Sequence, residues 1–155
     1  MGSDQSLGGY IMENALVLSE NKLQGGVSNK RVFCSLDMTK EENIDKIIST
    51  QDSENMKYIK DMKGQVIECI GVYITEREVQ DANEEGEIIN LLKHVTILFD
   101  KEGGQYVTGS NAFYQSLDLI CTFKGYPTEE KPMKLKVVET PAKEKGHTYL
   151  KCTIA

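Results

Sequence analysis

The chain has 155 residues, of which 39% are apolar and 27% charged, and its mean hydropathy of −0.39 is typical of a soluble globular protein and excludes a disordered one. No apolar run approaches the roughly 20 residues that span a bilayer, and no signal-peptide pattern precedes the domain. We therefore expect a cytoplasmic protein without a membrane partner, with a flexible leader at 1–10 and one domain over 11–155.

The net charge of −6 is unevenly distributed along the chain. Residues 37–102 carry 16 acidic and eight basic side chains, whereas residues 120–155 carry seven lysines and four glutamates. A strand of phosphates responds to this local distribution more than to the total charge. The net negative charge of the whole chain therefore does not exclude binding of a nucleic acid by its last third.

Two short β-prone runs at 15–18 and 32–36 predict an opening hairpin, with Lys30 and Arg31 near its mouth. The segment that follows begins with a Thr39–Glu42 pair at the spacing of a helix capping box. It then carries isoleucine and methionine at helical spacing as far as a glycine. We expect a helical insert at 39–63, either one broken helix or two short ones, that covers one end of a sheet.

A long β segment at 65–79 contains Gly71, where a residue without a Cβ atom permits a bulge. An acidic loop at 80–87 connects this segment to a partner strand at 88–100. The loop begins like a calcium-binding loop, but Leu92 stands where the bidentate glutamate is required. A solvated hairpin loop is therefore the expected structure.

A short strand at 105–108 precedes a helix that Ser110 or Asn111 can cap. The helix places apolar side chains on one face, at Phe113, Leu117, Ile120 and Cys121.

The chain closes with two runs in which apolar and polar residues alternate, 133–137 and 147–154. Because successive side chains leave opposite faces of a strand, one face is apolar and the other basic and aromatic. The second face would hold Lys134, Lys136, Tyr149, Lys151 and Thr153, with Lys143 and Lys145 in the connecting loop. Such a face suits single-stranded nucleic acid, because lysines neutralise phosphates and a ring stacks on bases. An ordinary half-exposed hairpin has the same pattern.

The resulting order of elements, β-β-α-β-β-β-α-β-β, predicts a β-rich α+β fold with two short helical elements on an antiparallel, strongly coiled sheet. A small barrel of the oligonucleotide-binding (OB) type fits this order. An open α+β sheet fits it almost as well.

The sequence contains no recognisable catalytic or metal-binding pattern. Its four cysteines are at least 31 residues apart and each lies in an apolar run, which indicates reduced core thiols. His94 and His147 have no second ligand at a helix-face spacing, and neither glycine pair opens a helix as a phosphate loop does. We therefore expect a binding protein and not an enzyme, with no cofactor and no metal.

The order of elements over residues 64–155 resembles the small single-stranded-DNA-binding proteins of tailed phages that copy linear genomes by protein priming, and their relatives on other mobile elements. The similar features are the strand Gln65-Val-Ile-Glu, a strand ending in Phe99-Asp100, an aromatic-containing strand, an amphipathic helix, and the closing hairpin with Lys136-Val-Val and Tyr149-Leu. The resemblance implies a protein that coats single-stranded DNA without sequence preference during replication, in the bacterial host cytoplasm.

Two functional hypotheses follow. In the first, the chain binds single-stranded DNA through Lys134, Lys136, Tyr149, Lys151, Lys143 and Lys145, with Lys30, Arg31, Tyr73 and Tyr106 as weaker candidates. For each of these residues a solvated strand face is the alternative. In the second hypothesis the chain is a phage-type interaction module. It would bind a host or replisome protein through the helical insert or the acidic segment 76–87, with Glu84, Glu85 and Glu87 as the sensitive positions.

Overall fold

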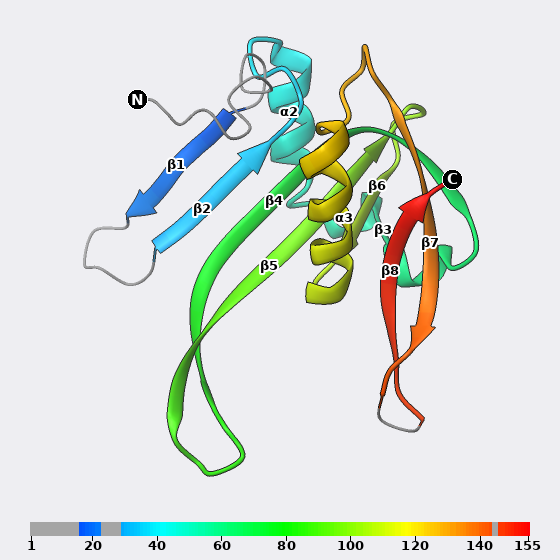
Figure 1. The fold of residues 1–155 in the computed structure, drawn as a ribbon. Helices are drawn as coiled ribbons and strands as arrows, with labels where there is room; N and C mark the ends of the chain where they lie inside the picture. The colour runs from blue at the N-terminus through cyan, green and yellow to red at the C-terminus, as the bar shows by residue number, and fades with distance from the viewer. Residues whose placement is uncertain (1–15, 23–28, 144–145) are drawn as a thin grey trace.

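A single curled sheet forms the frame of the protein in the computed structural model, which describes residues 16–22, 29–143 and 146–155 (Figure 1). The described strands are β1 Leu16–Lys22, β2 Asn29–Cys34, β3 Met56–Tyr58, β4 Val66–Ala82, β5 Ile88–Asp100, β6 Gln105–Thr108, β7 Met133–Pro141 and β8 Thr148–Ile154. The helices are α2 Glu41–Ser49 and α3 Asn111–Lys124, together with the short 3-10 helices η2 Ser53–Asn55 and η3 Ile59–Met62. The expected leader at 1–10 and the residues 23–28 that connect the two strands of the opening hairpin lie outside the described residues.

Strand β4 is the branch point of the sheet. Its first residues, Val66 to Cys69, pair with β7. From Cys69 to Ala82 it pairs with β5 on one side, and Tyr73 to Arg77 also pair with β2 on the other. The described pairs are antiparallel except β3–β6, so the sheet is mixed, whereas an antiparallel sheet was expected. Among the described strands β8 pairs with β7 alone, and the sheet therefore curls into a half-barrel without closing.

Gly71 interrupts β4 as expected. The pairing register with β5 shifts between Cys69 and Gly71, which is a β-bulge. A Cβ atom on Gly71 would lie 2.7 Å from Cγ of Leu36 and closer still to Cδ2 of the same side chain. The bulge therefore lets the backbone of β4 approach Leu36, and any larger residue would collide with that side chain.

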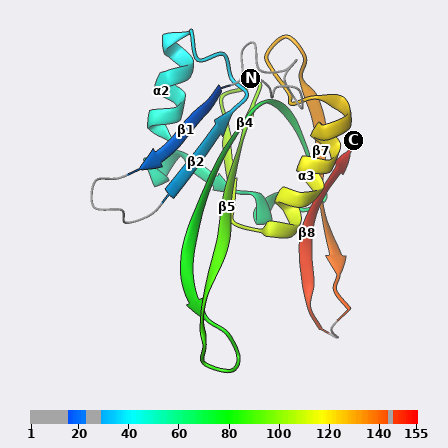
Figure 2. The ribbon, with the colours of Figure 1, turned by 60° about the vertical axis from the view of Figure 1, so that its left-hand side comes forward.

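Helices pack on both faces of the sheet, so the protein has two cores (Figure 2). On one face, α3 contributes Phe113, Leu117 and Cys121. These side chains pack against β4 and β5 and also against the inner side of β7 and β8, at Val72, Ile74, Leu98, Leu135, Val137 and Cys152. On the other face, α2 packs near Leu36, Ile70, Ile97 and Phe99.

Helix α3 begins at one of the two expected caps, Ser110. The Phe113 N–H donates to Oγ of Ser110, which caps the helix, at 3.1 Å, and Gly125 ends the helix with a positive φ of 83°.

The insert at 39–63 differs from the expectation. Helix α2 is present, but the predicted capping box is wrong, because the Thr39 hydroxyl donates to Asp37 Oδ1 at 2.6 Å and the N-cap is Lys40. Beyond the helix, the Asp52 carboxylate accepts the Glu54 N–H at 3.1 Å and turns the chain. The remaining residues form η2, β3 and η3 instead of a second α-helix.

Tertiary contacts explain why residues 56–62 do not form a second α-helix. Strand β3 pairs with β6 in parallel, Met56 packs into the α2-side core, and Ile59 is buried in the α3-side core. The apolar side chains of this segment are therefore divided between two separate cores, and they do not form one face of a helix.

The four cysteines are free thiols buried in the structure, as expected. Burial raises the pKa of Cys34 to about 11 and the pKa of Cys69 to about 12. Burial, together with the hydrogen bond to Asp100, raises the pKa of Tyr106 to about 12.

These shifts predict that stability falls in alkali. The unfolded chain loses these protons at about pH 9 for the thiols and about pH 10 for the phenol, whereas the folded chain keeps them to higher pH. Above pH 9 the folded state therefore binds more protons, and the free energy of unfolding should fall as pH rises. Urea unfolding at pH 7.5, 9.0 and 10.5 under reducing conditions measures this; a constant free energy of unfolding across the series would contradict it.

Candidate nucleic-acid interface

The alternation expected in the closing hairpin is present in the structure. Leu135, Val137 and Cys152 are buried against α3. On the opposite side of the same strands, Lys134, Lys136, Tyr149 and Lys151 are exposed. The hairpin therefore has an apolar inner side, which packs on α3, and a basic exposed side.

The strand register brings these exposed side chains together. Lys136 lies opposite Thr153, Val138 opposite Lys151, and Thr140 opposite Tyr149, and directly opposed residues in an antiparallel pair project to the same face. Strand β4 extends this surface, because Val66 lies opposite Lys136 and Glu68 opposite Lys134. We call this surface the outer face; it comprises Val66, Glu68, Lys134, Lys136, Val138, Thr140, Tyr149, Lys151 and Thr153.

The lysines of the outer face are not engaged in ion pairs within the described part of the chain. Glu68, the acidic neighbour of Lys134 in register, forms no salt bridge with it. The ion pair of this hairpin is on the inner side, where Lys63 Nζ lies 2.8 Å from Glu139 Oε2. That lysine and the Thr148 hydroxyl hold the pKa of the Glu139 carboxyl below its usual value. The amino groups of Lys134, Lys136 and Lys151 are thus available to a polyanion.

The remaining predicted lysines and arginine are not gathered on this surface. Lys143 is exposed in the loop beyond β7, and Lys145 lies outside the described residues. Lys30 and Arg31 are in β2, opposite Arg77 and Glu76 of β4, on the other flank of the sheet from β7 (Figure 1). The side chains of Lys30 and Arg31 are not among those described.

The two weaker aromatic candidates lie among core residues. Tyr106 is only 6% exposed, and its hydroxyl donates to Asp100 Oδ2 at 2.7 Å. Tyr73 is half-buried beside the α2-side core, where burial raises its pKa. Tyr106 therefore has no exposed ring face on which a base could stack. Tyr73 pairs with Cys34 of β2 and Ile97 of β5, outside the part of β4 that pairs with β7.

The sequence analysis missed an exposed aromatic residue in the insert at 39–63. Tyr58 in β3 is 54% exposed, and the Lys60 Nζ atom lies 5.4 Å from its ring centroid, a cation–π distance. Assigning 39–63 to helix concealed this pair. The alternation Met56-Lys57-Tyr58 was the signal that could have identified a strand there.

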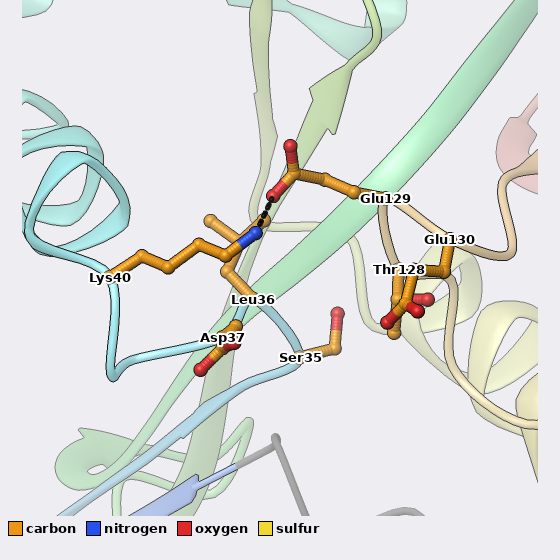
Figure 3. Close-up of a pocket in the computed structure, with 7 residues that line it drawn as sticks. All are labelled: Ser35, Leu36, Asp37, Lys40, Thr128, Glu129 and Glu130. Carbon is orange, nitrogen blue, oxygen red and sulfur yellow. Dashed lines mark ion pairs between the residues drawn. The ribbon is translucent and has the colours of Figure 1, made fainter.

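A small pocket lies where the end of β2 meets the loop before β7 (Figure 3). Its volume of about 30 Å³ holds no more than one or two water molecules. Ser35 at its base accepts the Val72 N–H at 2.8 Å and donates to the Pro127 carbonyl at 2.9 Å, and Lys40 lies 3.9 Å from Glu129 at its rim. These contacts are structural, and the pocket is too small for an organic substrate.

Within residues 16–22, 29–143 and 146–155, no cluster of three His, Cys, Asp or Glu side chains has the geometry of a metal site. No helix in that part of the chain is long and apolar enough to cross a membrane. Comparison with protein-family models, curated proteins and solved structures finds no match to this chain. A function for this chain is therefore inferred from the geometry of its own residues.

Proposed function

We propose that this protein binds single-stranded DNA without sequence preference, through the outer face, and coats displaced strands during phage or mobile-element replication. The observation that carries the proposal is the common orientation of Lys134, Lys136, Lys151 and Tyr149 on one exposed surface, where the three lysines form no ion pair with any described residue. The lysines would neutralise phosphates, and the tyrosine ring would stack on a base.

The arrangement of the sheet also supports this proposal. The chain order β4-β5-β6-α3-β7-β8, with β7 returning to pair with β4, is compatible with a barrel of the OB type. The β4–β5 and β7–β8 hairpins project from the same end of the sheet in both views (Figures 1 and 2). In OB barrels the loops of the corresponding hairpins flank the bound oligonucleotide.

The expected salt dependence is moderate. Three to four neutralised phosphates on a single strand give a slope of roughly −2 to −3 in a plot of log affinity against log salt. Affinity should therefore fall by roughly 20- to 50-fold between 50 and 200 mM salt. A protein that held the strand by stacking alone would not show this dependence.

Reversing the charge of the outer face should abolish DNA binding while the fold is retained. The variant is K134E/K136E/K151E, and the measurement is fluorescence anisotropy with labelled oligo-dT and with a duplex of equal length, at 50 and 200 mM salt. We expect salt-sensitive binding of the single strand by the wild type, and a loss of at least 100-fold in the variant. Circular dichroism and thermal unfolding should be unchanged, because all three side chains are exposed.

The matched control is K93E/K101E/K124E, which makes the same change of net charge at exposed lysines outside the outer face. It should weaken binding only by a few-fold. Equal losses in the two triple variants would place the contact elsewhere, and absence of binding at micromolar wild-type protein in low salt would reject the proposal.

A second candidate function is protein binding through the β4–β5 hairpin. The observation that favours it is the exposure of two large apolar side chains on this acidic hairpin, Ile88 at 68% and Leu92 at 47%. Exposed apolar groups of this size on a projecting ribbon are a common feature of protein interfaces.

A further inference from the structure

The β4–β5 hairpin extends well beyond α3, β1 and β2 (Figures 1 and 2). At the point where it leaves the body, His94 Nε2 lies 2.8 Å from Glu76 Oε2, and the His94 ring stacks on Tyr114 of α3 with centroids 3.9 Å apart. Beyond this point the two strands pair with each other as far as Ala82 and Ile88. We call residues 77–93 the arm.

The arm carries both charge and apolar surface. It has five acidic and two basic residues, a net charge of −3. Leu92 lies opposite Glu78, and Ile88 opposite Ala82, on the same face of the ribbon, and both apolar side chains are exposed. A two-stranded ribbon is marginally stable by itself in water, so a partner that covered this face would stabilise it.

We propose that the arm docks on the outer face of a second copy of this chain. The residues that form the β7–β8 hairpin, 133–154, carry five lysines and two glutamates, a net charge of +3 that complements the arm. The outer face also offers apolar surface to Ile88 and Leu92, because Val66 is 49% exposed and Tyr149 is 38% exposed. Charge and apolar groups are therefore matched on the two surfaces.

The contact has to be intermolecular. The inner side of β7 and β8 packs on α3, and α3 packs on β4 and β5, so the outer face points away from the arm of its own chain. Arm-to-arm pairing is disfavoured because it would bring five acidic residues of each copy together. The arm and the outer face are different surfaces, so the contact is head-to-tail and can build a ring or an open row of copies.

If the outer face also binds single-stranded DNA, as proposed above, the arm and a single strand would compete for Lys134, Lys136 and Lys151. Oligo-dT should then dissociate the assembled copies. Self-association itself does not depend on any affinity for DNA.

A charge exchange between the two surfaces tests the docking. The arm variant E78K/E84K/E85K changes the arm from −3 to +3, and it spares Glu87, whose carboxylate accepts a hydrogen bond from Asn83 at 3.2 Å. The face variant is K134E/K136E/K151E, which changes the β7–β8 hairpin from +3 to −3. Sedimentation velocity measures the assembly of each protein, and of their equimolar mixture, over a range of concentrations in 50 mM salt.

We expect the wild type to associate in a concentration- and salt-dependent manner. Each variant alone should have its dissociation constant raised at least tenfold, because its two surfaces then carry the same sign of charge. The equimolar mixture should associate again, because each surface meets a complementary one. A wild type that stays monomeric, a variant that associates like the wild type, or a mixture that stays monomeric would each overturn the proposal.

Apolar substitutions identify the face of the arm. The double variant I88N/L92N should weaken association at least tenfold, whereas L119N/F123N, on the exposed side of α3, should leave it unchanged. The opposite pattern would assign the contact to α3 and overturn the proposal. The two ideas fail separately: association without binding of oligo-dT would reject the proposed function alone, and binding of oligo-dT by a strict monomer would reject the arm contact alone.

Discussion

Replacing Phe113 by alanine should lower the free energy of unfolding by about 3–5 kcal/mol. Phe113 is fully buried on α3, and its ring lies in the core that β4, β5, β7 and β8 share. Truncation to alanine removes the apolar contacts of the ring and leaves a cavity that the curled sheet can only partly close. At a few degrees per kcal/mol for a chain of this size, the melting temperature should fall by roughly 10 °C.

The effect matters for function because α3 connects the two parts of the half-barrel. It packs against β4 and β5 on one side and against β7 and β8 on the other, so it sets the position of the outer face relative to the arm. A loosened α3 would free the β7–β8 hairpin, whose strand pairing with the rest of the described sheet is the short run of Val66–Cys69 with β7.

The same helix supplies the control. Phe123 is 81% exposed, and its replacement by alanine should change the free energy of unfolding by no more than about 0.5 kcal/mol. Urea unfolding followed by circular dichroism measures both variants. Similar losses for F113A and F123A would show that α3 is not anchored by Phe113, and would contradict this account of the core.

Replacing Gly71 by alanine should lower the free energy of unfolding by about 1–3 kcal/mol through overpacking. The added methyl group would overlap the Leu36 side chain, which is itself buried at 1% exposure and has little room to move. Gly109 is the control, because a Cβ atom there meets no heavy atom within 4 Å. G109A should therefore leave stability almost unchanged.

A double-mutant cycle with Leu36 tests the cause. Leu36→Ala alone should cost about 2–5 kcal/mol through its cavity. The added methyl group of G71A would fill part of that cavity, so the double variant should lose less stability than the sum of the two single losses. Additive losses would mean that the G71A effect comes from the bulge backbone and not from contact with Leu36.

Elements with a strong local pattern were predicted correctly from sequence. The period-two alternation in the closing hairpin, the Ser110 cap with its apolar helical stripe, and the bulge at Gly71 are all present. These signals are local because side-chain direction in a strand and capping of a helix depend on neighbours within a few residues. The co-facial position of Lys134, Lys136, Tyr149 and Lys151 follows from them.

The exposure of individual aromatic rings was not predicted correctly from local sequence patterns. Tyr106 has the sequence environment of an exposed strand residue, yet it is buried by α3, which follows it in the chain, and by Ile59, which precedes it by nearly fifty positions. Tyr58 was hidden in a segment assigned to helix, because only pairing with β6 makes it a strand. In both cases a distant partner determines the exposure of the ring.

The amino-acid sequence by itself determined which side chains share a face, because the helical and strand periods act over a few residues at a time. It also determined the separation of an acidic middle from a basic end. The tertiary structure decided which of those faces meet water, since burial depends on helices packed from elsewhere in the chain. It also decided that β4 and β5 continue past the body as an arm, because the length of a hairpin beyond its support depends on where the other elements end.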